Sequence, residues 1–215
     1  MTGAVKFPLL ELLTEPDRLA VLGTLKMLKF EAGQVVYERD GPCMDAFFIF
    51  EGKIRIDMRD QNGEVAFFDY RYPGSFIGWF SAITDLPQPV TTSAMEKSLL
   101  GRMPGPAFMA MVLARRDLSA YMLRMMGERL ISDTKRIGHL IVLDALRRVA
   151  AEILERARGA PVIIVPPRVD MAARLGMTRE TLAKQLSELG RRGLIRVDGN
   201  KVDILDARQL AELVG

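Results

Sequence analysis

Arg179, Glu180 and Lys184 have side chains that can bind the edges of DNA bases. Leucines recur at helical spacing between Thr178 and Arg192, which predicts a helix whose opposite face carries these three residues. In the major groove an arginine can donate two hydrogen bonds to O6 and N7 of guanine, and a glutamate can accept one from N4 of cytosine. We therefore expect Arg179 and Glu180 to contact bases, with Lys184 exposed beside them on the same face of the helix.

Other cationic and hydroxyl side chains surround this helix, and they suit phosphate oxygens better than base edges. Such contacts position a protein on the duplex but carry no sequence information. The expected phosphate contacts are Thr178, Arg168, Ser187, Arg191, Arg192, Arg196 and Lys201. The alternative is an ordinary solvated helix face.

A helix-turn-helix would position these residues. Arg168 to Leu175 reads as a first helix, Gly176-Met177 as a tight turn and Thr178 as the N-cap of a second helix. The core between the two helices is expected to contain Leu182, Leu186, Leu189, Val169, Ala172 and Leu175.

Two short strands follow the second helix. Leu194 to Val197 and Lys201 to Leu205 flank Asp198-Gly199-Asn200, a tight-turn sequence. This hairpin would form a wing beside the helix-turn-helix.

A long helix is predicted in the middle of the chain, where the residues between Pro106 and Arg158 include no proline. Its apolar stripe, at spacings of three and four with one acidic position, consists of Leu123, Met126, Leu130, Asp133 and Ile137. This stripe is a candidate homodimer seam. The alternative is a helix that packs on its own domain. A second helix, about Val142 to Arg156, follows Gly138.

An antiparallel β module is predicted from about Thr24 to Arg102, where short β-prone runs alternate with glycine turns. A helical N-terminal segment from Leu9 to Leu28 would pack on its side. The expected fold class is α+β, with an N-terminal antiparallel β-roll, a long dimerisation helix and a C-terminal winged helix-turn-helix. We assign residues 1–116 to the β-roll with its flanking helices, 117–137 to the dimerisation helix and 138–215 to the DNA-binding domain.

Composition and charge exclude several classes of protein. The chain has 215 residues, of which 49% are hydrophobic and 27% charged, as in ordinary globular proteins. Formal charge is −3 over residues 1–104 and +6 over residues 105–215, which favours a polyanionic partner for the second half. No apolar run reaches the roughly 20 residues of a membrane-spanning helix. With a single cysteine, Cys43, we expect a cytoplasmic protein that does not act at a membrane.

The sequence resembles the CRP/FNR family of transcription regulators over nearly its whole length. One anchor is Gly176 to Thr181, similar to the start of that family's recognition helix. Others are Ile137-Gly138-His139-Leu140 with Leu143-Asp144, similar to its hinge, and Pro73 to Gly78, similar to the opening of its cyclic-nucleotide cassette. The resemblance implies a homodimer that binds double-stranded DNA and works with RNA polymerase.

The resemblance also implies a TGTGA-like half-site within a palindrome. Arg179 and Glu180 match base-reading residues of the cyclic-AMP receptor proteins, whereas Lys184 stands where those proteins have an arginine. Because lysine is a point charge without a guanidinium fork, preference at that base pair should be looser or altered.

The effector pocket departs from the family pattern. Gly78 is followed by Trp79 and Phe80 instead of the ribose-binding Glu, and the phosphate-binding Arg-Ser pair aligns without gaps on Pro89 and Val90. Cyclic AMP is therefore not expected to bind in the usual manner, because an anionic diester requires charge-assisted donors. Either a non-standard set of groups, including the hydroxyls of Thr91 and Thr92, binds an effector such as a cyclic dinucleotide, or Trp79 and Phe80 fill the vacated space.

Asp133 and Thr134 match the adenine-contacting positions on the long helix. Two Asp133 carboxylates at a dimer seam would repel each other. A shared proton, Lys135, Arg136 or a bound ligand could relieve this repulsion.

No metal or cofactor is expected. One cysteine cannot hold an iron–sulfur cluster, and the single histidine, His139, fits a structural role better than haem ligation. Cys43 is expected to be a bystander thiol.

Two functions outside DNA-binding regulation remain as alternatives. A hydrolytic enzyme is disfavoured, because we find no Ser/His/Asp set, metal-ligand cluster or phosphate-binding glycine loop. A ligand-binding adaptor acting through proteins would not require the basic helix-turn-helix and wing.

Overall fold

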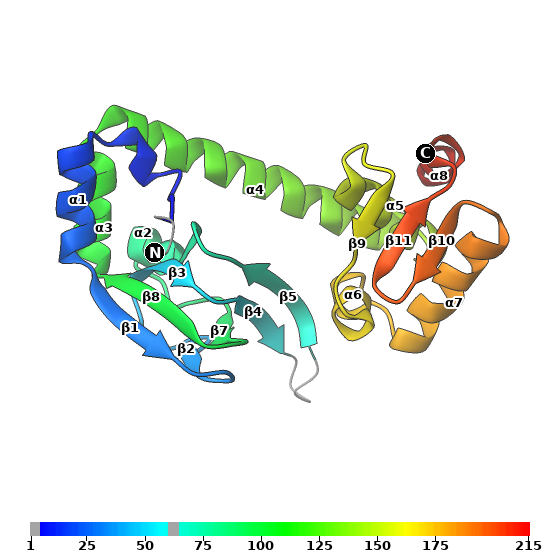
Figure 1. The fold of residues 1–215 in the computed structure, drawn as a ribbon, viewed down its shortest axis with the longest axis horizontal. Coiled ribbons are helices and arrows are strands. Elements are labelled where there is room, and N and C mark those ends of the chain that lie inside the picture. Colours follow the sequence, from blue (N-terminus) through cyan, green and yellow to red (C-terminus); the bar gives the residue numbers. More distant parts are fainter. Residues whose placement is uncertain (1–4, 60–64) are drawn as a thin grey trace. The chain divides into compact units, whose positions relative to one another are not determined.

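The computed structural model describes residues 5–59 and 65–215 (Figure 1). The chain divides into two compact units, Met1–Glu128 and Arg129–Gly215. The fold class is α+β, as predicted: the N-terminal sheets are antiparallel, a long helix follows and a helix-turn-helix lies near the C-terminus.

The first unit combines two four-stranded antiparallel sheets with short helices. One sheet has the strand order β1-β8-β3-β6 and the other β2-β7-β4-β5. The elements are η1 (Leu10–Leu12), α1 (Glu15–Thr24), β1 (Lys26–Phe30), β2 (Val35–Tyr37), β3 (Ala46–Glu51), β4 (Ile54–Arg59), β5 (Val65–Arg71), β6 (Phe76–Ile77), α2 (Trp79–Thr84), β7 (Thr91–Ala94), β8 (Ser98–Met103) and α3 (Gly105–Leu113).

Strand β3 explains how this unit forms its core. Its first four residues are all buried, because alternate side chains enter two different apolar clusters. Phe47 and Ile49 pack with Ile54 and Leu100 between the sheets, whereas Phe48 faces the flanking helices. The Phe48 ring lies edge-on to that of Phe7, with 5.3 Å between the ring centroids.

The N-terminal helical segment is shorter than predicted. Helix α1 ends at Thr24, and Lys26–Phe30 forms β1 instead of continuing the helix. Its strand register pairs Lys26 with Arg102 and Phe30 with Ser98. A full ladder with β8 satisfies the backbone groups of these residues, and this pairing outweighs local helix propensity.

Helix α4 (Arg116–Val142) is the long helix predicted from the sequence, but it continues beyond Ile137. Gly138 does not end it. A glycine inside a helix costs only about 1 kcal/mol, which the surrounding helical residues can offset. Helix α5 (Ala145–Ala157) begins where the Asp144 carboxylate accepts a hydrogen bond from Arg147 N at 2.9 Å.

The second unit contains the helix-turn-helix and the wing. After α5, its elements are β9 (Val162–Ile164), α6 (Arg168–Arg174), α7 (Arg179–Arg191), β10 (Ile195–Asp198), β11 (Lys201–Ile204) and α8 (Ala207–Val214). Helices α6 and α7 form the helix-turn-helix, and strands β10 and β11 form the wing. The predicted wing hairpin is present, with Asp198 opposite Lys201 around the turn. Strand β9 was not predicted; it pairs with β11 and extends the hairpin to three strands.

Across the described ranges, no helix combines the length and the apolar composition needed to cross a membrane.

Candidate nucleic-acid interface

The turn between α6 and α7 forms as the sequence predicted. Gly176 has a φ of +61°, a left-handed conformation that favours glycine. The Thr178 hydroxyl accepts a hydrogen bond from Thr181 N at 3.1 Å and so caps α7. Leu182, Leu186 and Leu189 are buried, which leaves the opposite face of α7 to solvent.

Val169 does not belong to the core, contrary to the prediction. It is 50% exposed, whereas Met171, Ala172 and Leu175 are buried. At 100° per residue, Val169 lies about 200° around the helix axis from Met171, which puts it on the opposite face of α6.

An open groove of about 980 Å³ lies between the exposed face of α7, the start of α6 and strand β10. It brings together five of the predicted DNA-contacting residues. These are Arg168, Arg179, Glu180, Ser187 and Arg196. The remaining predicted contacts, Thr178, Lys184, Arg191, Arg192 and Lys201, do not line the groove.

The arginines of the groove form no ion pair with the residues that the structure describes. In the described part of the chain, no carboxylate oxygen lies within 4.0 Å of the charged nitrogens of Arg168, Arg179 or Arg196. Lys184, exposed on α7, likewise has none. These side chains can bind an external anion without first breaking an ion pair.

Glu180 is held in its ionised form. A hydrogen bond from its own backbone N–H, another from the Thr178 hydroxyl and the charge of Arg179 lower the pKa of its carboxyl group. An ionised carboxylate only accepts hydrogen bonds, as a contact with the amino group of cytosine requires.

Arg191 and Arg192 both bind Glu188, a partner that the sequence analysis missed. Arg191 Nη2 lies 2.8 Å from Glu188 Oε1, and Arg192 Nε lies 2.7 Å from the same oxygen. The signal was present in the sequence, because residues three and four positions apart are neighbours on a helix. Lys201 is also paired, with 3.2 Å between its Nζ and Asp203 Oδ1.

Glu152 links helix α5 to α6, the first helix of the helix-turn-helix. Its side chain is 6% exposed and forms ion pairs with Arg156 on its own helix and with Arg174 on α6, the latter with 2.9 Å between Nε and Oε1. The sequence analysis did not identify this residue, because nothing in its local pattern distinguishes a buried glutamate from an exposed one.

The cassette that resembles a cyclic-nucleotide site begins at Gly78, which has a φ of +79°. A Cβ there would overlap the carbonyl oxygen of Asp45, so glycine is required. The Trp79 and Phe80 rings stack with 4.0 Å between their centroids. Trp79 packs against the apolar cluster beneath the helices, whereas Phe80 is 43% exposed and fills no interior space.

A buried glutamine closes the cassette. Gln88 is 1% exposed, and its Nε2 donates hydrogen bonds to the carbonyl oxygens of Gly78 at 3.0 Å and Cys43 at 3.2 Å. Pro89 next to it is exposed, and Val90 packs between the sheets. The Arg-Ser positions of the family pattern therefore provide no cation here.

The two threonines of β7 contact other parts of the roll. Thr91 Oγ1 accepts a hydrogen bond from Arg39 N at 3.1 Å. Thr92 is fully buried beside Tyr37. Burial raises the pKa of the Tyr37 hydroxyl to about 12, although Thr92, Gly78 and Arg71 act in the opposite direction.

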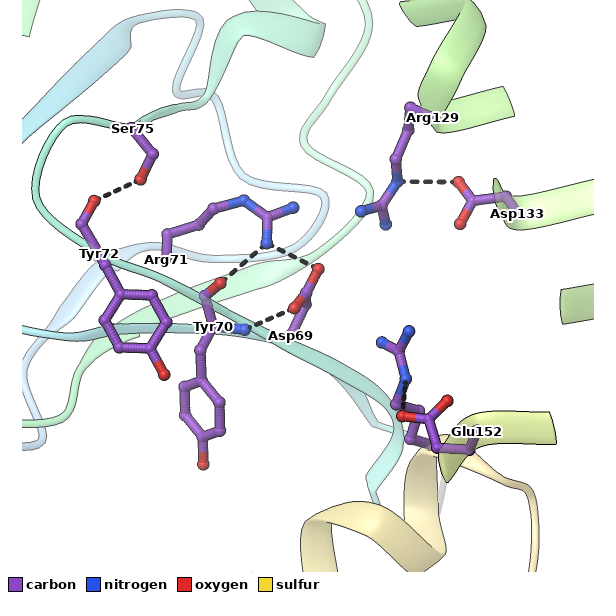
Figure 2. Close-up of polar contacts among 9 residues, drawn as sticks. Asp69, Tyr70, Arg71, Tyr72, Ser75, Arg129, Asp133 and Glu152 are labelled. Carbon is purple, nitrogen blue, oxygen red and sulfur yellow. Dashed lines mark hydrogen bonds and ion pairs between the residues drawn. The ribbon is translucent and has the colours of Figure 1, made fainter. Parts of the chain in front are cut away.

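Strand β5 places a cation on the inner face of the roll. Its register sets Arg71 opposite the buried Ile54, and Asp69 opposite Ile56. Figure 2 shows Arg71 donating to Asp69, with 2.6 Å between Nη1 and Oδ2, and to the carbonyl oxygen of Tyr70. The sequence analysis did not consider this arginine, because only the strand register reveals which way it faces.

Asp133 forms an ion pair with Arg129 on its own helix. Its Oδ2 lies 2.9 Å from Arg129 Nε, one helical turn earlier on α4 (Figure 2). The sequence analysis had considered a shared proton, Lys135, Arg136 or a bound ligand as ways to relieve the repulsion, and had not considered Arg129. Thr134 beside it is exposed.

The predicted dimer seam is a solvent-exposed apolar stripe on α4. Leu123 is 70% exposed, Leu130 69% and Ile137 54%, while Met126 is half-buried. Leu140 extends the stripe by one more position. Such a stripe on one helix indicates a surface that another apolar surface covers.

No group of three or more potential metal ligands occurs in residues 5–59 and 65–215. Cys43 is half-buried, and burial raises the pKa of its thiol. His139 is half-buried in the last turn of α4.

Comparisons with known proteins match both units. The cyclic nucleotide-binding domain matches residues 27–115, and the Crp-like helix-turn-helix domain matches residues 147–213. The chain is 26% identical over 206 residues to the CRP-like cAMP-activated global transcriptional regulator of Mycobacterium tuberculosis, with 92% of each chain covered.

Solved structures share the fold. A CooA mutant from Carboxydothermus hydrogenoformans matches with a TM-score of 0.79 and 19% identity, covering 100% of this chain and 99% of that one. A CRP/FNR-family regulator from Thermus thermophilus matches with a TM-score of 0.64 and 25% identity, covering 88% of this chain and 98% of that one.

Proposed function

Because this chain belongs to the CRP/FNR family of transcription regulators, we propose that it acts as a homodimer that reads a TGTGA-like palindrome in double-stranded DNA. The observation that carries this proposal is the groove beside α7, where Arg168, Arg179 and Arg196 converge without a carboxylate partner. The exposed helix between them can enter a major groove about 12 Å wide.

Within this interface, the residues divide between base and phosphate contacts. Arg179 and Glu180, in the first turn of α7, read guanine and cytosine edges. Lys184 contacts a third base with looser preference. Arg168, Ser187 and Arg196 hold phosphates along the walls of the groove. The Thr178 hydroxyl acts mainly as the helix cap.

The homodimer is supported by the exposed stripe on α4. Two such helices would cover Leu123, Leu130 and Ile137 from each chain, which otherwise remain in water. Arg129 supplies each Asp133 with a counter-charge on its own helix, and this lowers the repulsion between the two carboxylates. Asp133→Asn is expected to leave dimer stability nearly unchanged, and sedimentation of both proteins would measure it. RNA polymerase is the expected partner at the promoter.

The β-roll is proposed not to bind cyclic AMP in the usual manner, since Gln88, Pro89 and Val90 offer no cation to its phosphate. One observation favours the second candidate, a regulator that responds to a nucleotide through a non-standard pocket. Arg71 lies on the inner face of the roll, and an anionic ligand could displace Asp69 from it. In that candidate Arg71 would supply the missing charge.

Fluorescence anisotropy on a TGTGA-type palindrome and a scrambled duplex tests the main proposal. Adding cyclic AMP, cyclic GMP or cyclic di-GMP separates the candidates. Selective binding without any nucleotide supports regulation independent of those nucleotides. Binding that requires one of them, and that Arg71→Gln removes, supports the second candidate. Equal affinity for both duplexes under every condition contradicts sequence-specific DNA binding.

A further inference from the structure

Glu188 binds two arginines at the C-terminal end of α7, the helix proposed to enter the major groove of DNA. Its Oε2 accepts from Arg191 Nε at 2.9 Å, and its Oε1 accepts from Arg191 Nη2 at 2.8 Å and from Arg192 Nε at 2.7 Å. One carboxylate thus binds two guanidinium groups, and one of them through two parallel hydrogen bonds.

This carboxylate occupies the groups that a phosphate would bind. Guanidinium groups recognise carboxylates and phosphates with the same forked geometry, so the two anions compete. This competition takes place at the edge of the protein's groove beside α7, because Gly190, the residue before Arg191, lines that groove. The Arg191 side chain is 75% exposed and can exchange one partner for another.

Glu188 remains charged under all ordinary conditions. The hydrogen bonds from Arg191 and Arg192 lower the pKa of its carboxyl group to about 2. The competitor is therefore always present at neutral pH.

We propose that Glu188 is an internal counter-anion that withholds Arg191 and Arg192 from the DNA backbone and so limits the sequence-independent part of DNA affinity. The inference rests on the proposed function. Backbone contacts strengthen binding to every sequence and steepen its salt dependence, by about 0.9 in the slope of log K against log salt for each phosphate. Glu188 sets that contribution low, while Arg168 and Arg196 in the groove remain available.

The test compares Glu188→Gln with Glu212→Gln. Both changes remove one negative charge from an ion pair on a helix of the same unit, but Glu212 pairs with Arg208 on α8, and neither lines the groove. Affinities for the palindrome and for a scrambled duplex are measured by anisotropy between 50 and 300 mM salt. Glu188→Gln should tighten binding to both duplexes about three- to tenfold near 100 mM salt and steepen the slope by about 1 to 2 per subunit. Glu212→Gln should change either affinity less than about twofold.

A second pair of variants asks whether the arginines cause the gain. Arg191→Gln with Arg192→Gln should have little effect while Glu188 is present, and should cancel the gain in the Glu188→Gln background. Equal effects in both backgrounds would show that the arginines contact DNA despite Glu188, and this would overturn the inference.

Two further outcomes are decisive. If Glu188→Gln folds normally by circular dichroism and binds no more tightly than Glu212→Gln, the inference is wrong. If Glu188→Gln fails to fold, Glu188→Asp, which keeps the charge on a shorter arm, should give an intermediate gain; no gain in that variant also refutes it. Failure of the proposed function is separate, because it appears as wild-type protein that does not distinguish the palindrome from the scrambled duplex.

Discussion

The groove beside α7 and the cassette of the β-roll differ in whether their polar groups are already paired within the protein. In the groove, Arg168, Arg179 and Arg196 have no carboxylate within ion-pairing distance among the described residues. In the roll, Arg71 binds Asp69, and the buried amide of Gln88 binds two carbonyl oxygens. The groove is thus ready for an anion, whereas the cassette is closed by its own hydrogen bonds.

The difference indicates which ligand each region can accept without rearrangement. A cation in contact with water can exchange its hydration for a phosphate. A charged ligand that enters the roll must first displace internal partners, and each buried group left unpaired costs free energy. We therefore expect DNA binding to be intrinsic to the second unit. An effector that enters the roll would have to replace the hydrogen bonds that it displaces with contacts of its own.

The largest effect should come from Arg179→Ala. Losing a bidentate contact to guanine costs about 1–3 kcal/mol per half-site, so the dimer should lose specific affinity roughly 30-fold or more. Anisotropy on the palindrome measures this loss, and affinity for the scrambled duplex should change much less. Equal losses on both duplexes would remove the base-reading role and weaken the contrast between the two regions.

Glu152→Gln should come next, because it tests the support beneath the groove. Removing one partner from a buried ion pair destabilises proteins by up to several kcal/mol, and since Arg156 and Arg174 are partly exposed we expect about 2–3 kcal/mol. Urea denaturation followed by circular dichroism measures the change. Glu155→Gln, an exposed position on the same helix, is the matched control and should shift stability by less than about 0.5 kcal/mol.

Tyr37→Phe sharpens the description of the roll as a closed interior. Burial raises the folded-state pKa of Tyr37 to about 12 from its ordinary value of 10.0, so the folded protein retains a proton that the unfolded chain loses. The stabilising contribution is complete below pH 10 and declines as pH rises from 10 to 12. Between pH 8 and pH 11, wild type should lose about 1.4 kcal/mol more stability than Tyr37→Phe.

Chemical denaturation at these two pH values measures that difference, and Tyr72→Phe, at a position that is 54% exposed, is the control. Identical pH dependence of Tyr37→Phe and wild type would mean that water reaches the Tyr37 hydroxyl.

The smallest effect is expected from Arg196→Ala, which removes one phosphate contact per subunit. Affinity for palindrome and scrambled duplex should fall together by about three- to tenfold near 100 mM salt, with a shallower salt dependence. Arg208→Ala, on α8 and 89% exposed, removes the same charge outside the groove and should have little effect. A loss confined to the palindrome would make Arg196 a base-reading residue.

Features that depend on neighbouring residues could be predicted from the sequence. The Thr178 cap, the leucines of α7 and the wing turn follow from spacings within one or two helical turns, and all are present. The local pattern failed at Val169, which is exposed although Ala172 and Leu175 of the same predicted core are buried, and at Lys26–Phe30, where pairing with β8 overrides the expected helix.

The candidate site required more than spacing. Seven residues were expected to hold phosphates, but only Arg168, Ser187 and Arg196 of these line the groove. Arg191 and Arg192 are bound by Glu188, and Lys201 is bound by Asp203. The sequence alone does not reveal whether a carboxylate already binds a given arginine or lysine, so these phosphate contacts could not be assigned from it.

The sequence by itself determined the α+β class, the helix-turn-helix, the wing and the solvent-exposed face of α7, because these depend on periodicity and capping over short distances. Only the tertiary structure decided which charges are available. Arg71 faces the interior of the roll through its strand register, Gln88 closes the cassette from ten residues beyond Gly78, and Glu152 reaches Arg174 on another helix. Contacts between groups distant in the sequence depend on the folded geometry. These contacts determine which charged side chains are already paired within the protein and which are available to a ligand.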